Sequence, residues 1–144
     1  MQKKRKINIV IDANWYISAC INRNSRQVLY HKILKKKHIH VYYSDELLAE
    51  FEGVISREKF RKIISLKQAN RLIQFVLLFV RKVEIKTIPK LVRDSNDDYL
   101  LGICESCKAD YLITGDKDLL VLKSYNNTLI FTMGEFLNLI NKPL

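Results

Sequence analysis

Proline and glycine are scarce in this chain of 144 residues, which has two prolines and four glycines. So few chain-breaking residues argue against long disordered linkers. The most apolar stretch, residues 72–80, is far shorter than the ~20 residues that a membrane-spanning helix needs. The first apolar run, residues 7–11, ends at Asp12 and is too short for a secretory signal. We therefore expect one soluble domain over residues 1–144, with residues 1–6 as a flexible basic tail.

Cysteine is also rare, and its pattern does not form a metal site. An odd count of three, without a signal peptide, indicates reduced thiols and a cytoplasmic location. Cys104 and Cys107 form a C-x-x-C pair, but a structural zinc site normally needs four ligands and no second pair exists. We expect this pair to pack inside a helix. The three histidines, His31, His38 and His40, form no ligand pattern and receive no role.

Acidic residues are outnumbered, with 15 Asp and Glu against 25 Lys and Arg, for a formal net charge of +10. Such an excess favours an anionic partner: nucleic acid, an anionic membrane surface or an acidic protein. Two basic runs, residues 3–6 and 35–38, are candidates for phosphate contacts, although such runs are more often solvated faces. Three aromatic residues are candidates for base stacking, with core packing as the alternative: Trp15, Tyr42 and Tyr43.

Strand-like segments alternate with helical ones along the chain. Because no Asn-Gly type of turn joins two strands, the alternation predicts a parallel sheet. We expect an α/β, three-layer fold in which a central, mostly parallel sheet of about five strands carries helices on both faces. The expected strands are residues 7–11, 39–43, 83–87, 110–114 and 128–131. The expected helices are residues 28–37, 45–55, 57–64, 66–82, 95–108 and 117–123, and one after Thr132.

Capping residues precede four of these helices and support their assignment. A Ser or Thr before a helix accepts a hydrogen bond from its first turn, and a Gln or an acid three residues later can complete the cap. The candidates are Ser44, Ser65 with Gln68, Ser95 with Asp98, and Thr132 with Glu135.

Carboxylates follow two of the predicted strands, where an open parallel sheet binds its ligands. Asp12 follows the first strand, and Asp116 and Asp118 follow the fourth. A further group lies before the intervening helix: Asp94, Asp97 and Asp98. Any one of these three taken alone is more often a cap or a turn residue. The informative feature is that three chain segments bring acids to one edge.

Clustered carboxylates repel one another unless they share protons or hold a divalent metal. Oxygen ligands favour Mg²⁺ or Mn²⁺. A basic surface around such a centre is suited to cutting nucleic acid, because the surface attracts the backbone and the metal activates water.

At these residues the sequence resembles the PIN domains. "VIDANWYIS" (10–18) is similar to the opening of that family, and "SDELLAEF" (44–51) to the segment with its conserved glutamate. "DDYLLGIC" (97–104) and "LITGDKDLL" (112–120) are similar to the segments with the third and fourth acids. The order of motifs over residues 7–139 most resembles the toxin components of bacterial toxin–antitoxin systems, the VapC-like ribonucleases.

The resemblance implies a metal-dependent ribonuclease with four acids: Asp12, Glu50, Asp97 and Asp116. Of these, Asp12, Asp97 and Asp116 would be metal ligands. Supporting roles would fall to Asn14 beside Asp12, and to Thr114 and Asp118 beside Asp116. Asp94 and Asp98 remain alternatives for the third acid.

Helical spacing does not identify the glutamate. Glu50 and Glu52 both lie roughly 100° from the centre of their helix's apolar face, so only the resemblance favours Glu50.

The favoured interpretation is an Mg²⁺- or Mn²⁺-dependent endoribonuclease that acts as the toxin of a type II toxin–antitoxin pair. One alternative is a PIN nuclease of RNA maturation or decay, and another is a catalytically inactive PIN-fold module that binds RNA or protein. The expected partners are RNA and an antitoxin protein, without a membrane. A homodimer is left open by the sequence.

Overall fold

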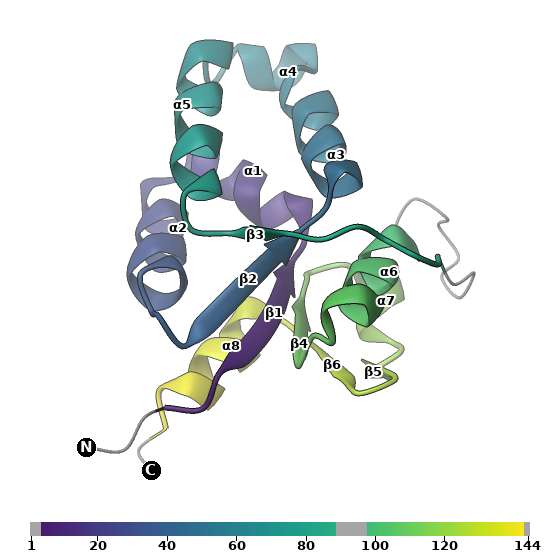
Figure 1. Cartoon of the computed structure of the whole chain (residues 1–144). Coiled ribbons are helices and arrows are strands. Elements are labelled where there is room, and N and C mark those ends of the chain that lie inside the picture. The colour runs from purple at the N-terminus through teal and green to yellow at the C-terminus, as the bar shows by residue number, and fades with distance from the viewer. Residues whose placement is uncertain (1–3, 89–97, 143–144) are drawn as a thin grey trace.

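A six-stranded sheet forms the centre of the structure, a computed structural model that describes residues 4–88 and 98–142 (Figure 1). The strand order is β3-β2-β1-β4-β6-β5. All neighbours are parallel except the β5–β6 pair. The predicted α/β class and mostly parallel sheet are therefore confirmed. The strands are β1 (Ile7–Ile11), β2 (Ile39–Tyr43), β3 (Arg81–Lys82), β4 (Tyr111–Ile113), β5 (Ser124–Tyr125) and β6 (Thr128–Phe131).

Helices flank this sheet. Helix α6 packs along β1, β2 and β4, whereas α7 and α8 contact β6. Figure 1 shows α3, α4 and α5 standing together beyond the carboxyl end of β2. The helices are α1 (Ala13–Ile21), α2 (Arg23–Val28), the π-helix η1 (Leu29–Leu34), α3 (Asp45–Ile55), α4 (Glu58–Arg61), α5 (Leu66–Leu77), α6 (Asp98–Cys107), α7 (Lys117–Leu120) and α8 (Met133–Ile140).

The core is built around β1, whose β-branched residues are buried on both faces. Ile9, Val10 and Ile11 are fully inaccessible to solvent. A strand covered by helices on both faces is expected to have such a continuous apolar run, and this one is bounded by its charged and polar flanks. The three cysteine thiols are free and buried, which confirms the expectation that Cys104 and Cys107 pack inside a helix. None of the described helices is long and apolar enough to cross a membrane.

The predicted caps are present where the structure describes them. The side chain of Ser44 accepts a hydrogen bond from the N–H of Leu47 at 3.3 Å. Complete capping boxes begin α5, at Ser65 and Gln68, and α8, at Thr132 and Glu135. The fourth predicted cap, Ser95, lies outside the described residues.

The strand predicted at residues 83–87 is wrong. The third strand is the preceding pair Arg81–Lys82, and the helix before it ends at Leu77. Residues 85–87 cross over α6 instead of continuing the sheet. A Cβ added at Gly102 of α6 would lie 2.7 Å from Cγ2 of Ile85 and 2.9 Å from the carbonyl oxygen of Thr87. The alternation of apolar and polar residues there reflects packing on a helix.

Two further local predictions need correction. The sequence indicated no hairpin, but β5 and β6 form one through Asn126 and Asn127. Asn126 has a φ of 52°, and asparagine is one of the few non-glycine residues that adopt this left-handed conformation readily. The helix expected over residues 28–37 begins earlier, at Arg23, because the side chain of Asn22 caps it, and it continues as η1.

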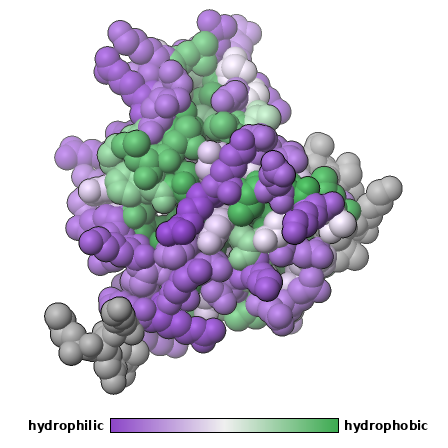
Figure 2. Space-filling model, viewed as in Figure 1, coloured by the Kyte–Doolittle hydropathy of each residue, from purple (hydrophilic) through white to green (hydrophobic). Residues whose placement is uncertain are grey.

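The exposed face of α5 carries an apolar patch. Phe75 and Leu78 keep 41% and 79% of their surface exposed. The ring of Phe75 packs against Tyr30 and Phe79, with centroids 5.5 and 5.1 Å away. Figure 2 shows this apolar area in green over the lower part of α5 and beside α2. Contiguous apolar surface of this kind is typical of protein–protein contacts.

Candidate active site

The carboxyl ends of β1 and β4 are adjacent, and Asp12 lies where they meet. Its backbone N–H donates to the carbonyl of Ile113 at 2.9 Å, which ties the two strand ends together. Its side chain caps α1 by accepting from the N–H of Asn14 at 3.2 Å. The other carboxylate oxygen accepts from the hydroxyl of Thr114 at 2.6 Å. Only 4% of Asp12 is exposed, and its hydrogen bonds hold the buried side chain in place at the carboxyl ends of the strands.

Thr114 links Asp12 to Asp116. The Thr114 side chain is fully buried, and the oxygen that donates to Asp12 also accepts from the N–H of Asp116 at 3.0 Å. Asp116 in turn caps α7, with Oδ1 accepting from the N–H of Asp118 at 2.8 Å. A single buried hydroxyl therefore fixes one acid directly and the loop of the other acid through its backbone.

The electrostatics of Asp12 match this crowding. Burial raises the pKa of Asp12 above its ordinary value, and the negative charge of Asp116 raises it further. The hydrogen bonds from Thr114 and from the Asn14 backbone act in the opposite direction. A carboxylate whose charged form is penalised by burial and by a second acid gains from a nearby cation.

A second polar contact joins α3 to the start of α6. The hydroxyl of Tyr99 donates to the carboxylate of Glu50. Of the three glutamates on α3, Glu46 and Glu52 are exposed, whereas Glu50 is half-buried. The contact thus distinguishes Glu50 from Glu52, which helical spacing could not do.

The residue before Tyr99 is Asp98, the first residue of α6, and only 3% of it is exposed. An acid in the first turn of a helix is stabilised as an anion by the helix dipole. The other two candidates for the third acid, Asp94 and Asp97, lie outside the described residues. The described chain thus brings Asp12 and Asp116 together through Thr114 and places Glu50 against the start of α6.

The residues expected to support the acids contact them mainly through their backbones. Asn14 and Asp118 donate backbone N–H groups to Asp12 and Asp116, whereas Thr114 uses its side chain. Tyr99 was not anticipated from the sequence. In "DDYLL" only the acids have a recognisable pattern, and a tyrosine just inside a helix is typical of a core residue.

The residues described do not include a group of three His, Cys, Asp or Glu side chains arranged to hold a metal. The groups that could bind a metal here all offer oxygen atoms: two carboxylates and a hydroxyl at the ends of β1 and β4. Their chemistry fits Mg²⁺ or Mn²⁺, which bind through one or two carboxylates and keep several waters.

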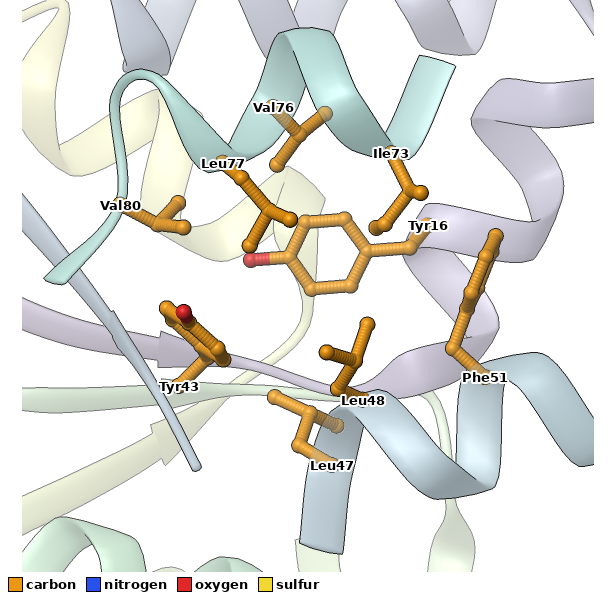
Figure 3. Close-up of a pocket in the computed structure, with 9 residues that line it drawn as sticks. All are labelled: Tyr16, Tyr43, Leu47, Leu48, Phe51, Ile73, Val76, Leu77 and Val80. Atoms are coloured by element: carbon orange, nitrogen blue, oxygen red, sulfur yellow. The ribbon is translucent and has the colours of Figure 1, made fainter. Parts of the chain in front are cut away.

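An apolar cavity lies between α1, α3 and α5 (Figure 3). The Tyr16 hydroxyl points into it and has no hydrogen-bond partner among the described residues, and burial raises its pKa. The volume of about 20 Å³ has room for roughly one water molecule. The cavity is too small for a nucleotide, and its lining contains no carboxylate. Trp15, Tyr42 and Tyr43 pack against the core, which favours packing over base stacking for these rings.

Residues 8–118 match the family model of the PIN domain. The chain belongs to the PIN domain family. PIN domains are in general nucleases. This PIN domain is 31% identical over 131 residues to the uncharacterized protein MJ1680 of Methanocaldococcus jannaschii, across 88% of this chain and 82% of that protein.

Two solved structures share the PIN fold of this chain. One is PAE2754 from Pyrobaculum aerophilum, with a TM-score of 0.62 and 15% identity, over 94% of this chain and 91% of that one. The other is VapBC2 from Rickettsia felis bound to a DNA fragment from their promoter, with a TM-score of 0.59 and 17% identity, over 86% of this chain and 97% of that one. At these identities the likeness establishes the fold, and the PIN-like architecture predicted from the sequence is confirmed.

Proposed function

We propose that this PIN domain, comprising residues 1–144, is an Mg²⁺- or Mn²⁺-dependent endoribonuclease. The observation that carries the proposal is the network in which Thr114 joins Asp12 and Asp116 at the carboxyl ends of two central strands. A buried acid beside a second, half-buried acid costs stability, and a bound divalent cation offsets that cost. In a nuclease family with a basic chain, RNA is the substrate that matches this arrangement.

Asp12 and Asp116 would hold the metal, together with one acid from the start of α6. That third acid would be Asp97, with Asp94 and Asp98 as the alternatives. When bound, the metal supplies an activated water and stabilises charge on the phosphate. Thr114 keeps the Asp12 carboxylate and the Asp116 loop in place, so that these ligands are held before the metal binds. Asn14 and Asp118 complete the two caps.

Glu50 would act on the attacking water as a hydrogen-bond acceptor. The Tyr99 hydroxyl fixes one side of its carboxylate and thereby limits its rotamers. Tyr99 is a positioning residue in this scheme, because it acts through Glu50. Removal of a positioning partner typically costs 10–100-fold in metal affinity or activity.

Cleavage of single-stranded RNA by the purified protein tests the nuclease proposal. We expect cleavage with Mn²⁺ that stops with EDTA, and a loss of at least about 100-fold for Asp12→Asn and for Asp116→Asn. Asp110→Asn is the matched control, because the Asp110 carboxylate accepts from the N–H of Asn8 at 2.9 Å at the other end of the strands. Full activity of both site variants, or cleavage that ignores EDTA, would overturn the assignment. RNA binding without cleavage would instead favour the alternative function, a catalytically inactive PIN-fold module that binds RNA.

We further propose that the nuclease is the toxin of a type II pair and acts in the cytoplasm. The resemblance of its motifs to VapC-like toxins supports this role, and so does the fold shared with VapBC2. The apolar patch on α5, around Phe75 and Leu78, is available for a protein partner. We expect an antitoxin with acidic residues for the basic surface and an Arg or Lys for the carboxylates. A second copy of the chain is the other occupant that the patch could accept.

Expression of the chain alone in its own host tests the toxin role. We expect growth arrest from the parent and normal growth from Asp116→Asn at an equal protein level. Harmless expression of an active parent nuclease would exclude the toxin role and favour a PIN nuclease of RNA maturation or decay.

A further inference from the structure

Residues 4–6 of the first basic run lie beside the second run, residues 35–38, at the end of the sheet opposite the carboxylates. Strands β1 and β2 are parallel with Ile7 opposite Ile39, so the residues that precede each strand lie side by side. The N–H of Ile7 donates to the carbonyl of His38 at 2.8 Å, which fixes this neighbourhood. In Figure 1 the start of β1 and the end of α8 lie together at this end, away from the carboxyl ends of the strands.

A groove of about 450 Å³ runs between these segments and the end of α8. Its lining includes four exposed cations: Lys4, Arg5, Lys6 and Lys142. Asp110 is the carboxylate in this lining, and it is engaged by the Asn8 backbone. Within residues 4–88 and 98–142, the ion pair found joins Lys82 to Asp45, so no described ion pair neutralises the groove cations.

The pKa values of two nearby histidines, His38 and His40, are lowered in part by the same positive charges. The pKa of His38 is lowered by burial and then by Lys4 and Lys36. The pKa of His40 is lowered by burial and then by Arg81 and Lys6. The cations of the basic runs therefore disfavour protonation of both imidazole rings.

We propose that this basic groove, defined by Lys4, Arg5, Lys6 and Lys142, is a second contact surface for the phosphate backbone of RNA. The inference rests on the proposed function, which makes RNA the substrate. Lysine is depleted at protein–protein interfaces, whereas Lys and Arg supply most phosphate contacts. The exposed apolar patch that suits a protein partner lies elsewhere, on α5.

The position of the groove determines which RNAs should use it. Strand β1 has five residues and separates the groove from Asp12 by about 16 Å along the strand. A short oligonucleotide bound at the carboxylates does not reach the groove, whereas a longer RNA contacts both. The groove should therefore increase affinity for long RNA without affecting cleavage of a short one.

Fluorescence anisotropy with labelled single-stranded RNA in EDTA tests this surface, because RNA stays intact without metal. The groove variant is Lys4→Gln/Lys6→Gln/Lys142→Gln. The control is Arg61→Gln/Lys62→Gln/Lys67→Gln, which removes as many exposed positive charges from the region of α4 and α5. Each is measured with RNAs of about 4 and about 16 nucleotides, the range of single-strand site sizes.

For the longer RNA we expect the groove variant to bind about tenfold more weakly and to lower the salt slope by about 2, which is ~0.7 for each lost phosphate contact. The control variant should show neither change, and cleavage of the short RNA with Mn²⁺ should be the same for both variants. Equal losses in both variants would overturn the proposal, because they would reflect net charge alone. Unchanged RNA binding with weaker binding of a polyglutamate peptide would also overturn it and assign the groove to an acidic protein.

The outcome is separable from that of the proposed nuclease activity. The groove variant could bind long RNA more weakly while the parent does not cleave RNA in Mn²⁺. That result would support the groove as an RNA contact surface and would overturn the catalytic proposal. Unchanged binding with a parent that does cleave RNA removes the groove and keeps the nuclease.

Discussion

The two ends of the central sheet carry opposite charge in opposite environments. At the carboxyl end, Asp12 is buried and tied by hydrogen bonds to Thr114 and Asn14. At the amino end, Lys4, Arg5 and Lys6 are exposed and have no described ion pair. Burying a charge is expensive, whereas leaving one in water costs little. Substitutions at the carboxyl end should therefore change stability and chemistry together, and those at the amino end should change binding alone.

The largest effect is expected for Thr114→Val, which keeps the shape of the side chain but removes its hydroxyl. The change leaves Asp12 without its shortest hydrogen bond and the Asp116 N–H without its acceptor. We expect a loss of about 2–3 kcal/mol in the free energy of unfolding and a fall of about 100-fold in cleavage rate. Urea unfolding and RNA cleavage measure the two. Thr114→Ser, which retains the hydroxyl, should recover most of both, and its failure to do so would contradict the proposed link.

A smaller effect is expected for Tyr99→Phe, which frees Glu50 from the hydroxyl of α6. We expect cleavage to fall by about tenfold, with the Mn²⁺ concentration for half-maximal activity little changed, because Glu50 is assigned to the water and not to the metal. Initial rates across an Mn²⁺ titration separate these effects. A purely structural role would lower the melting temperature and leave the rate per folded molecule unaltered.

The next effect concerns pH and stability without metal. Because burial raises the folded-state pKa of Asp12 above its ordinary value, folding favours the protonated form. Its contribution to stability is fully present below the unfolded pKa and is lost as the pH rises through the folded pKa. In EDTA at neutral pH, Asp12→Asn should therefore melt higher than the parent by about 3 °C, as for a gain of about 1 kcal/mol. The difference should vanish at a pH below the unfolded value, and a difference that is constant with pH would contradict this origin.

The smallest effect is expected at the amino end. The groove variant Lys4→Gln/Lys6→Gln/Lys142→Gln should melt at the parent temperature, because these side chains are exposed and have no described ion pair. Its cleavage of a short RNA should also match that of the parent. A clear loss of stability would show that these cations support the fold and would remove the contrast between the two ends.

Much of the fold is determined by local patterns that a single sequence displays. The strands at residues 7–11, 39–43 and 128–131 and the caps at Ser44, Ser65 and Thr132 are present as predicted. The predictions that were wrong concern segments whose structure depends on contacts with residues distant in the sequence. Residues 83–87 have a strand-like alternation but pack across α6 at Gly102, and no local pattern reveals that contact.

The same division applies to the candidate site. The topological rule for parallel sheets placed Asp12 and Asp116 at the carboxyl edge of the sheet, since each comes after a predicted strand. The Tyr99–Glu50 contact joins helices that are distant in sequence, and helical periodicity contains no information about it. The acidic set itself, with Asp97 and its alternatives, stays a prediction.

Thermal melts with and without Mn²⁺ test the central claim, that Asp12 and Asp116 hold a divalent cation. In EDTA, Asp116→Asn should melt above the parent because it removes one of two repelling charges and keeps the cap of α7. At a hundredfold excess of Mn²⁺ over Kd, the parent should gain about 2.7 kcal/mol. Asp116→Asn should gain much less, and Asp110→Asn should match the parent. An equal Mn²⁺ shift in the parent and in Asp116→Asn would contradict the account, because Asp116 would then not be a metal ligand.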